Sequence, residues 1–398
     1  MRGEAAGPAT RRARKGLLES TAMVYDPFPR GPHPVGVVSL ESRDEVRQRT
    51  LPLEVWYPAA VAHRGQDLEP ETQARYRPMP AAAPLPQAAV ADAAPAAGRH
   101  RLVAFSHGFA GHRCQSTFLC THLASHGYVV VAPDHVGNTT VDVMMEALKS
   151  FQAGGGLPDP AEMMGRVHAV ADLRPGDLSH AMDRVLDGGV PGAGEVDADR
   201  VGVVGHSFGG WTALMLAGRD PRVAAAVPLA PAGGAADLPV NPFADRLDLD
   251  WPRAVPTLYV AAARDSLLPL RGMHGLLART REPCALMVLA EMDHQHFCDN
   301  AEQIHEIFRA LPAPGPWGEL DLAGRMAPFA ELLPAADAEL AIRGLTLAHL
   351  DAQLRGRADA EHFLAGAVRT LAARGIGAER YEPPPAAAGA PADAATAK

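Results

Sequence analysis

From residue 101 onward, short and solidly apolar runs alternate with stretches of helical spacing, and this alternation constrains the fold more than any other feature. The apolar runs cover residues 102–105, 128–132, 201–204, 223–229, 257–262 and 285–290. Strands that are apolar on both sides are typical of a parallel sheet that helices cover on both faces. Between the runs, apolar residues such as Leu178, Met182 and Val185 repeat at helical spacing. We therefore expect a doubly wound, mostly parallel α/β sheet.

Two further strand-like runs, residues 35–40 and 50–57, precede this alternation. In the second run Leu51, Leu53 and Val55 occupy alternate positions, which is the pattern of a half-buried antiparallel strand. The sequence thus predicts an antiparallel hairpin at the N-terminal side of the parallel sheet.

The composition changes at several points and divides the chain into segments. Residues 1–34 are basic and then proline-rich and are expected to form a flexible arm, whereas residues 35–380 are expected to form one α/β domain. Inside that domain, residues 78–98 are almost entirely alanine and proline, which predicts a loop. Residues 139–175 interrupt the alternation, either as a lid or as a surface excursion. Residues 381–398 are alanine-rich and are expected to be disordered.

Charge and hydropathy exclude some classes of partner. The formal net charge of −9 leaves no basic surface for nucleic acid, and no apolar run reaches the roughly 18 residues that span a bilayer. A basic cluster at residues 11–15 is not followed by the apolar core of an export signal. We therefore expect a cytoplasmic protein that does not bind nucleic acid and has no membrane-spanning segment.

The four cysteines are Cys114, Cys120, Cys284 and Cys298, and none forms a C-x-x-C pattern. They are expected to be reduced thiols rather than disulfides or metal ligands. Neither they nor the histidines show the spacing of a metal site, so we expect no metal.

The residues most indicative of chemistry follow the run 201–204. Gly205-His-Ser207-Phe-Gly209 places a Gly-x-Ser-x-Gly motif between a predicted strand and a predicted helix, which is the context of a nucleophile elbow. The two glycines leave room for a sharp turn. Ser207 is therefore the predicted nucleophile.

A serine nucleophile needs a base and an acid that orients this base. In folds with such an elbow these partners follow in the order acid and then histidine. Asp265 follows the run 257–262 and is the predicted acid. His294 and His296 both follow the last run, and His294 is preferred because it lies nearer the strand end, with His296 as the second choice.

The oxyanion of a tetrahedral intermediate needs two hydrogen-bond donors. The backbone N–H of Phe208 is the first predicted donor, and that of Phe109 is the second, with Gly108 permitting close approach. His107 and His206 flank these groups and are expected to support them rather than act as bases.

Several of these motifs together resemble a known family. Residues 106–111, 123–135 and 205–210 resemble the dienelactone hydrolase-like bacterial hydrolases and the related platelet-activating factor acetylhydrolases. The resemblance extends over roughly residues 35–375. It implies the α/β-hydrolase fold and hydrolysis of esters with short or modified acyl groups, without a metal or organic cofactor.

The chain departs from both relatives in this resemblance. Dienelactone hydrolases have a cysteine nucleophile, whereas Ser207 stands here, so lactone specificity does not carry over. The acetylhydrolases take their acid from just after the strand that follows the elbow helix. Residues 228–232 contain no acid there, which returns this role to Asp265.

The sequence thus predicts a serine esterase that acts on a small-molecule carboxylic ester through an acyl-enzyme. An amidase or a perhydrolase would use the same triad. A binding protein that has lost activity on the same fold, or a lipase with an exposed apolar patch near residues 139–175, are the other hypotheses.

Overall fold

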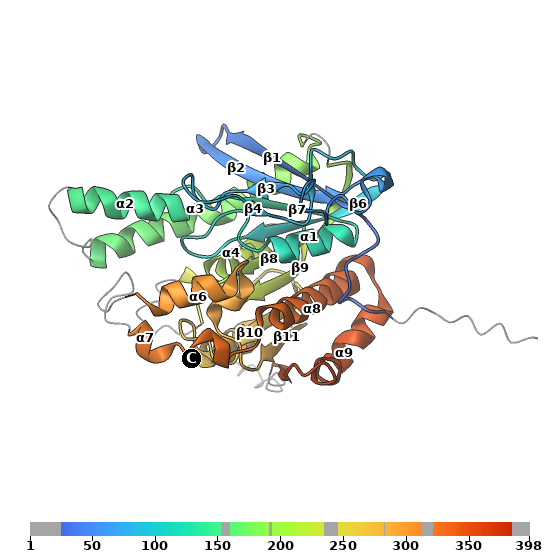
Figure 1. The fold of residues 1–398 in the computed structure, drawn as a ribbon. Coiled ribbons are helices and arrows are strands. Elements are labelled where there is room, and N and C mark those ends of the chain that lie inside the picture. The colour runs from blue at the N-terminus through green and yellow to red at the C-terminus, as the bar shows by residue number, and fades with distance from the viewer. Residues whose placement is uncertain are drawn as a thin grey trace, which may run out of the picture.

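The computed structural model describes residues 25–152, 160–190, 193–234, 246–281, 283–311 and 321–383. Within these ranges a central sheet has the strand order β12-β11-β10-β9-β8-β6-β7-β2-β1-β5 (Figure 1). Its strands are β1 (Val35–Asp44), β2 (Arg49–Pro58), β5 (Val90–Ala91), β6 (Arg99–Ser106), β7 (Tyr128–Pro133), β8 (Glu195–His206), β9 (Val223–Leu229), β10 (Thr257–Ala262), β11 (Cys284–Leu289) and β12 (Ala378–Tyr381). A separate small sheet pairs β3 (Arg75–Tyr76) with β4 (Leu85–Pro86).

The middle of the large sheet is parallel, from β7 through β11. Every residue of β7, β10 and β11 is buried, because helices cover both faces of these strands. On one side of this region β2 pairs antiparallel with both β1 and β7. The predictions of a mostly parallel sheet and of an N-terminal antiparallel hairpin are therefore confirmed.

Helices form a layer on each face of the sheet. They are α1 (Thr117–Ser125), α2 (Thr140–Gln152), α3 (Pro160–Leu186), α4 (Phe208–Arg219), α5 (Leu270–Arg279), α6 (Ala301–Arg309), α7 (Leu322–Arg325), α8 (Ala335–Arg355) and α9 (Ala358–Ala372). One core cluster joins α1, α8 and α9 to the sheet, and a second joins α3, α4 and α5 to it. None of the helices in the described ranges is both long and apolar enough to cross a membrane.

The chain reverses its direction across the sheet at β6. β6 lies between β7, which follows it in the chain, and β8, from which the sheet continues the other way. In open α/β sheets a ligand binds beyond the carboxyl ends of the strands at such a switch point. The end of β6 and the end of β8 are therefore the places where a site is expected.

The predicted segment boundaries correspond only partly to these elements. Residues 1–24 and 384–398 lie outside the described residues, but the end of the expected arm is packed. Phe28 is buried, with its ring 5.5 Å from that of Phe363, and the Tyr25 hydroxyl donates to Asp351 at 2.9 Å. At the other end, the expected tail begins inside β12, which pairs antiparallel with β11.

The two internal segments acquire more regular structure than the sequence suggested. Residues 78–98 contain β4 and β5, and the buried Gln87 between them accepts a hydrogen bond from the Trp56 indole at 2.6 Å. Residues 139–175 form α2 and more than half of α3, which continues through Pro175 to Leu186. In Figure 1, α2 and the start of α3 project beyond the edge of the sheet. The middle of the segment, residues 153–159, lies outside the described residues.

Candidate active site

The turn between β8 and α4 has the geometry of a nucleophile elbow. Ser207 has a φ of +57°, a left-handed conformation that a non-glycine residue seldom adopts. A Cβ on Gly209 would lie 1.9 Å from the Ser106 carbonyl oxygen, and one on Gly205 would lie 2.2 Å from that of Gly209. Only glycine fits at both positions, because β6, β8 and α4 meet there backbone to backbone.

Hydrogen bonds to the neighbouring strand fix this turn. The Ser207 N–H donates to the Leu229 carbonyl at 2.9 Å, and the Ser207 carbonyl accepts from the Ala232 N–H at 2.9 Å. Within the described residues the Ser207 hydroxyl itself makes no hydrogen bond. The backbone is thus held by the end of β9, while the hydroxyl is left for a substrate or a base.

The structure brings the predicted acid and base together. Asp265 follows β10 and His294 follows β11, and the His294 Nδ1–H donates to Asp265 Oδ2 at 2.8 Å. Asp265 Oδ1 accepts from the N–H groups of Leu267 and Leu268 at 3.0 and 2.7 Å, which fixes the carboxylate. With Nδ1 occupied, the Nε2 atom of His294 is the one available to a serine hydroxyl. The contact between base and nucleophile is often long in the absence of substrate.

A second carboxylate, which the sequence analysis did not single out, ties the acid loop to the base loop. Asp293 is buried, and its Oδ1 accepts from the Ser266 N–H at 2.8 Å and from the His294 N–H at 2.6 Å. Ser266 directly follows Asp265. Asp293 therefore fixes the distance between the two loops. Its only sequence signal is an aspartate at the start of the short helix 294–297.

The pKa of His294 is raised above its ordinary value of 6.5. Burial acts in the opposite direction and is the largest single influence, but the charge and hydrogen bond of Asp265, together with the charge of Asp293, outweigh it. This balance favours a histidine that can accept a proton during a reaction near neutral pH.

His296, the second candidate for the base, has a structural environment. Its Nε2–H donates to the Leu333 carbonyl at 2.9 Å, and its Nδ1 accepts the Asp293 N–H at 3.0 Å. The ring is buried and stacks on Phe329, with 4.7 Å between the ring centroids. Because both ring nitrogens are occupied by backbone groups, His296 has no atom available to take a proton from Ser207.

The loop after β6 lies against the elbow. A Cβ on Gly108 would lie 3.5 Å from the Cβ of Ser207, so no side chain separates this loop from the nucleophile. The Gly108 N–H donates to Gln115 Oε1 at 2.9 Å, and the Gln115 amide N–H donates to His206 Nδ1 at 3.1 Å. Gln115 is a further residue that the sequence analysis missed. Its side chain joins the loop that carries Phe109 to the strand that carries the nucleophile.

The two flanking histidines are buried and bound to their surroundings. His107 Nδ1–H donates to the Gly108 carbonyl at 2.7 Å, and His107 Nε2 accepts the His135 N–H at 3.0 Å. The ring of His206 lies 4.6 Å from the ring of His294. Burial is the main cause that holds the pKa of both His107 and His206 well below the usual range. Both rings are therefore neutral near pH 7, and their supporting role stays a prediction.

A mostly apolar cleft of about 500 Å³ opens beside the loop after β6 and the residue that follows His294. It is lined near the site by Phe109, Gly111 and Gln295. Its more distant walls come from the alanine-proline segment, from α2 and from α6, through Met79, Ala82, Leu85, Met144, Ile304, Ile307 and Phe308. Parts of the predicted loop 78–98 and of the segment 139–175, predicted as a lid or surface excursion, thus help to form the cleft.

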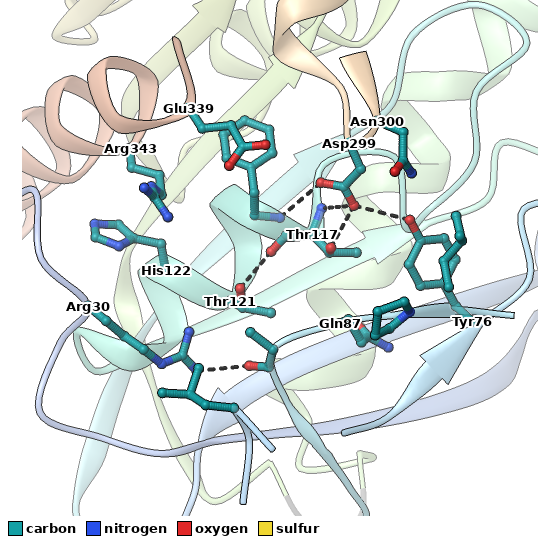
Figure 2. Close-up of a pocket in the computed structure, with 15 residues that line it drawn as sticks. Arg30, Tyr76, Gln87, Thr117, Thr121, His122, Asp299, Asn300, Glu339 and Arg343 are labelled. Carbon is teal, nitrogen blue, oxygen red and sulfur yellow. Dashed lines mark hydrogen bonds between the residues drawn. The ribbon is translucent and has the colours of Figure 1, made fainter. Parts of the chain in front are cut away.

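A second, more polar cavity of about 410 Å³, shown in Figure 2, adjoins this cleft. The two share Tyr76, Leu85, Asp299 and Asn300. The Tyr76 hydroxyl donates to Asp299 at 3.1 Å. Asp299 also accepts from the Thr117 N–H and hydroxyl at the start of α1, as Figure 2 shows. None of the residues Ser207, Asp265 and His294 lines this cavity, whereas the apolar cleft reaches their neighbours Phe109 and Gln295.

In the described part of the chain, no group of three or more His, Cys, Asp or Glu side chains is placed to hold a metal ion. The four cysteines are buried free thiols.

A parallel sheet with a strained serine at the end of β8 and an Asp–His pair beyond β10 and β11 defines an α/β-hydrolase. Comparison with known families gives a more specific assignment. The model of the dienelactone hydrolase family matches residues 88–311, and the chain belongs to this family. The dienelactone hydrolase part of the resemblance seen in the sequence is thereby confirmed.

Individual relatives are more distant. The chain is 29% identical to cutinase 2 of Thermobifida cellulosilytica over 169 residues, which are 42% of this chain and 49% of the cutinase. It is 30% identical to the bis(hydroxyethyl) terephthalate hydrolase of Streptomyces coelicolor over 174 residues, 44% of this chain and 42% of that enzyme. The matched segment thus spans half or less of these curated relatives.

A solved structure matches over a longer part of the chain. The ferulic acid esterase from Streptomyces cinnamoneus superposes with a TM-score of 0.55 at 25% identity, and the match covers 83% of this chain and 92% of that one. The agreement therefore extends over most of the α/β domain.

Proposed function

We propose that this protein is a carboxylic ester hydrolase with Ser207 as its nucleophile. The observation that carries the proposal is the hydrogen-bonded pair of Asp265 and His294, which lies at the same sheet edge as the strained Ser207 turn. The similarity to cutinases, a terephthalate ester hydrolase and a ferulic acid esterase supports ester hydrolysis independently of this geometry.

The reaction proceeds in two halves through an acyl-enzyme. Ser207 Oγ attacks the ester carbonyl while its proton passes to His294 Nε2, and Asp265 stabilises the imidazolium that forms. The oxyanion accepts hydrogen bonds from the N–H groups of Phe109 and Phe208. The C–O bond then breaks, and the leaving alcohol takes the proton from His294. A water molecule repeats these steps to release the acid and restore Ser207.

The cleft gives the proposal its substrate class. Its apolar walls and volume of about 500 Å³ suit an ester with an apolar aliphatic or aromatic part, held beside the oxyanion loop. Few charged groups line it, so a strongly charged acyl group would lose hydration without gaining an ionic partner.

The experiment is a turnover assay with p-nitrophenyl esters of increasing acyl length, together with the matched p-nitroanilides. We expect ester hydrolysis to become faster from acetate to medium acyl chains and then slower once the acyl chain is too long for the cleft. Ser207→Ala is the control and should lose nearly all turnover. Removal of the catalytic serine from a serine protease triad lowers kcat by about 10⁶-fold. Faster turnover of anilides than esters would instead indicate an amidase. Absence of turnover on every substrate would favour a binding protein on this fold.

A further inference from the structure

Arg174 on α3 is a fully buried arginine beneath the candidate oxyanion hole. Its Nε donates to the Thr212 hydroxyl at 2.9 Å and its Nη1 to Asn138 Oδ1 at 2.8 Å. Its Nη2 donates to the Ser106 hydroxyl at 3.2 Å and also to the His107 carbonyl. One guanidinium therefore binds the end of β6, the loop after β7 and the helix that follows the nucleophile.

These contacts reach both sides of the oxyanion hole. The His107 carbonyl belongs to the loop that two residues later supplies Phe109. On the other side, the guanidinium carbon lies 4.2 Å from the centroid of the Phe208 ring, and Thr212 is one helical turn beyond Phe208 on α4. Ser106 is itself held in place, because its hydroxyl contacts His135 Nε2 at 2.8 Å.

The charge of Arg174 is not explained by an ion pair. Among the described residues no carboxylate lies within ion-pair distance of its guanidinium, and its hydrogen-bond acceptors are all neutral. Burial lowers its pKa to about 9, with Asp177 opposing that shift, so the side chain stays charged at neutral pH. An unpaired buried charge destabilises the folded state relative to a neutral side chain of similar volume at the same position. Such a residue indicates a role beyond packing.

We propose that Arg174 is a positioning residue for the oxyanion hole, clamping the loop 106–109 against the start of α4 and placing a positive charge beneath the developing oxyanion. The inference rests on the proposed esterase function, because it assigns a role within that reaction. The role is exerted through Phe109 and Phe208, since Arg174 itself is covered by protein on all sides. Displacement of reacting groups by about 1 Å can reduce a rate by about 100-fold.

The test compares Arg174→Met and Arg174→Lys with wild type, using a p-nitrophenyl ester. Arg174→Met should lower kcat by about 100-fold with KM nearly unchanged, because the lost interaction acts on the transition state. The kcat of Arg174→Lys should fall by a smaller factor, because lysine retains the positive charge but lacks the planar guanidinium that binds four acceptors. The inhibition constant of phenylboronic acid, which forms a tetrahedral adduct, should rise in proportion to the loss in kcat/KM.

Leu371→Ala on α9 is the control, because it removes a fully buried side chain on another part of the fold. It should lower the melting temperature and leave kcat unchanged. If the Arg174 variants lose stability as this control does but keep the wild-type kcat, the positioning role of Arg174 is wrong and the proposed esterase function is unaffected. If Arg174→Met does not fold, Arg174→Lys is judged by the same criterion. A wild-type protein without ester turnover would overturn the proposed function and, with it, this inference.

Discussion

At the level of single residues, His294 and His296 lie two positions apart in the sequence but have different hydrogen-bond partners in the folded protein. His294 binds the Asp265 carboxylate through Nδ1, whereas both ring nitrogens of His296 bind backbone groups. No sequence pattern distinguishes the two. The difference depends on which carbonyl and which carboxylate each ring meets in the folded chain.

The raised pKa of His294 predicts the pH dependence of activity. The base must be neutral to accept the Ser207 proton, so kcat/KM should rise with pH and reach half its plateau above pH 6.5. In Asp265→Asn the charge that raises this pKa is lost, so the midpoint should shift downward. The plateau should also fall by about 10⁴-fold. Initial rates between pH 5 and 9 measure both effects, and an unchanged midpoint in the variant would contradict the assignment of the acid.

Replacement of His296 should affect stability rather than chemistry. His296→Asn loses the bond to the Leu333 carbonyl and the stacking on Phe329, so the free energy of unfolding should fall by about 1–3 kcal/mol. The value of kcat should stay within a few-fold of wild type. Urea unfolding and ester turnover, measured on the same preparation, test this prediction. A loss of kcat as large as in His294→Asn would show that the base had been assigned to the wrong residue.

At the scale of elements, the site depends on three segments that approach one another without intervening side chains. The carbonyl of Ser106 at the end of β6 lies where a Cβ of Gly209 on α4 would have to be. Gly205 has the same relation to the backbone of α4. The nucleophile elbow is therefore a junction of β6, β8 and α4 rather than a local turn.

This junction predicts opposite effects for two glycine substitutions in helices. Gly209→Ala should prevent soluble expression or abolish activity, because its Cβ would lie 1.9 Å from a backbone oxygen. Gly165→Ala on α3 is the matched control, since no atom lies within 4 Å of its added Cβ. It should leave activity unchanged and stabilise the protein by about 0.5–1 kcal/mol. Thermal unfolding and turnover of both variants provide the measurement, and an active, stable Gly209→Ala would contradict the described junction.

Local patterns in the sequence predicted most of these elements. The apolar runs correspond to β6 through β11, and the Gly-x-Ser-x-Gly motif correctly predicted the strand, turn and helix around Ser207. β12 was missed because Ala378–Tyr381 has no apolar pattern, and its strand conformation depends on pairing with β11. Arg174 and Gln115 were missed for a related reason. Arg174 binds His107, and Gln115 binds His206, and in each pair the two residues lie far apart in the sequence. No rule of residue spacing connects such pairs.

At the scale of the whole molecule, many histidines are buried in neutral form. Burial is the largest cause that lowers the pKa of His112 to about 4, of His135 to about 3 and of His349 to about 4. The pKa of His122 is held well below its ordinary value for the same reason. In the unfolded chain each of these side chains takes up a proton near pH 6.5.

These histidines predict a loss of stability in mild acid. Between pH 6.5 and about 4 the unfolded chain binds more protons than the folded protein, so the free energy of unfolding falls as the pH falls. Each such histidine contributes up to about 1.4 kcal/mol per pH unit, and His294, with its raised pKa, opposes them. Urea unfolding at pH 7.5, 6.5, 5.5 and 5.0 measures the trend. Stability that is constant across this range would contradict the neutral burial of these side chains.

Covalent labelling is the direct test of the assignment of Ser207 as a nucleophile that His294 activates. The purified protein is treated with a fluorophosphonate, digested, and mapped by mass spectrometry, with Ser207→Ala and His294→Asn as comparisons. We expect one phosphonylated peptide that carries the adduct on Ser207, none in Ser207→Ala, and strongly slowed labelling in His294→Asn. An unlabelled wild-type protein, or an adduct on another residue that persists in Ser207→Ala, would contradict it.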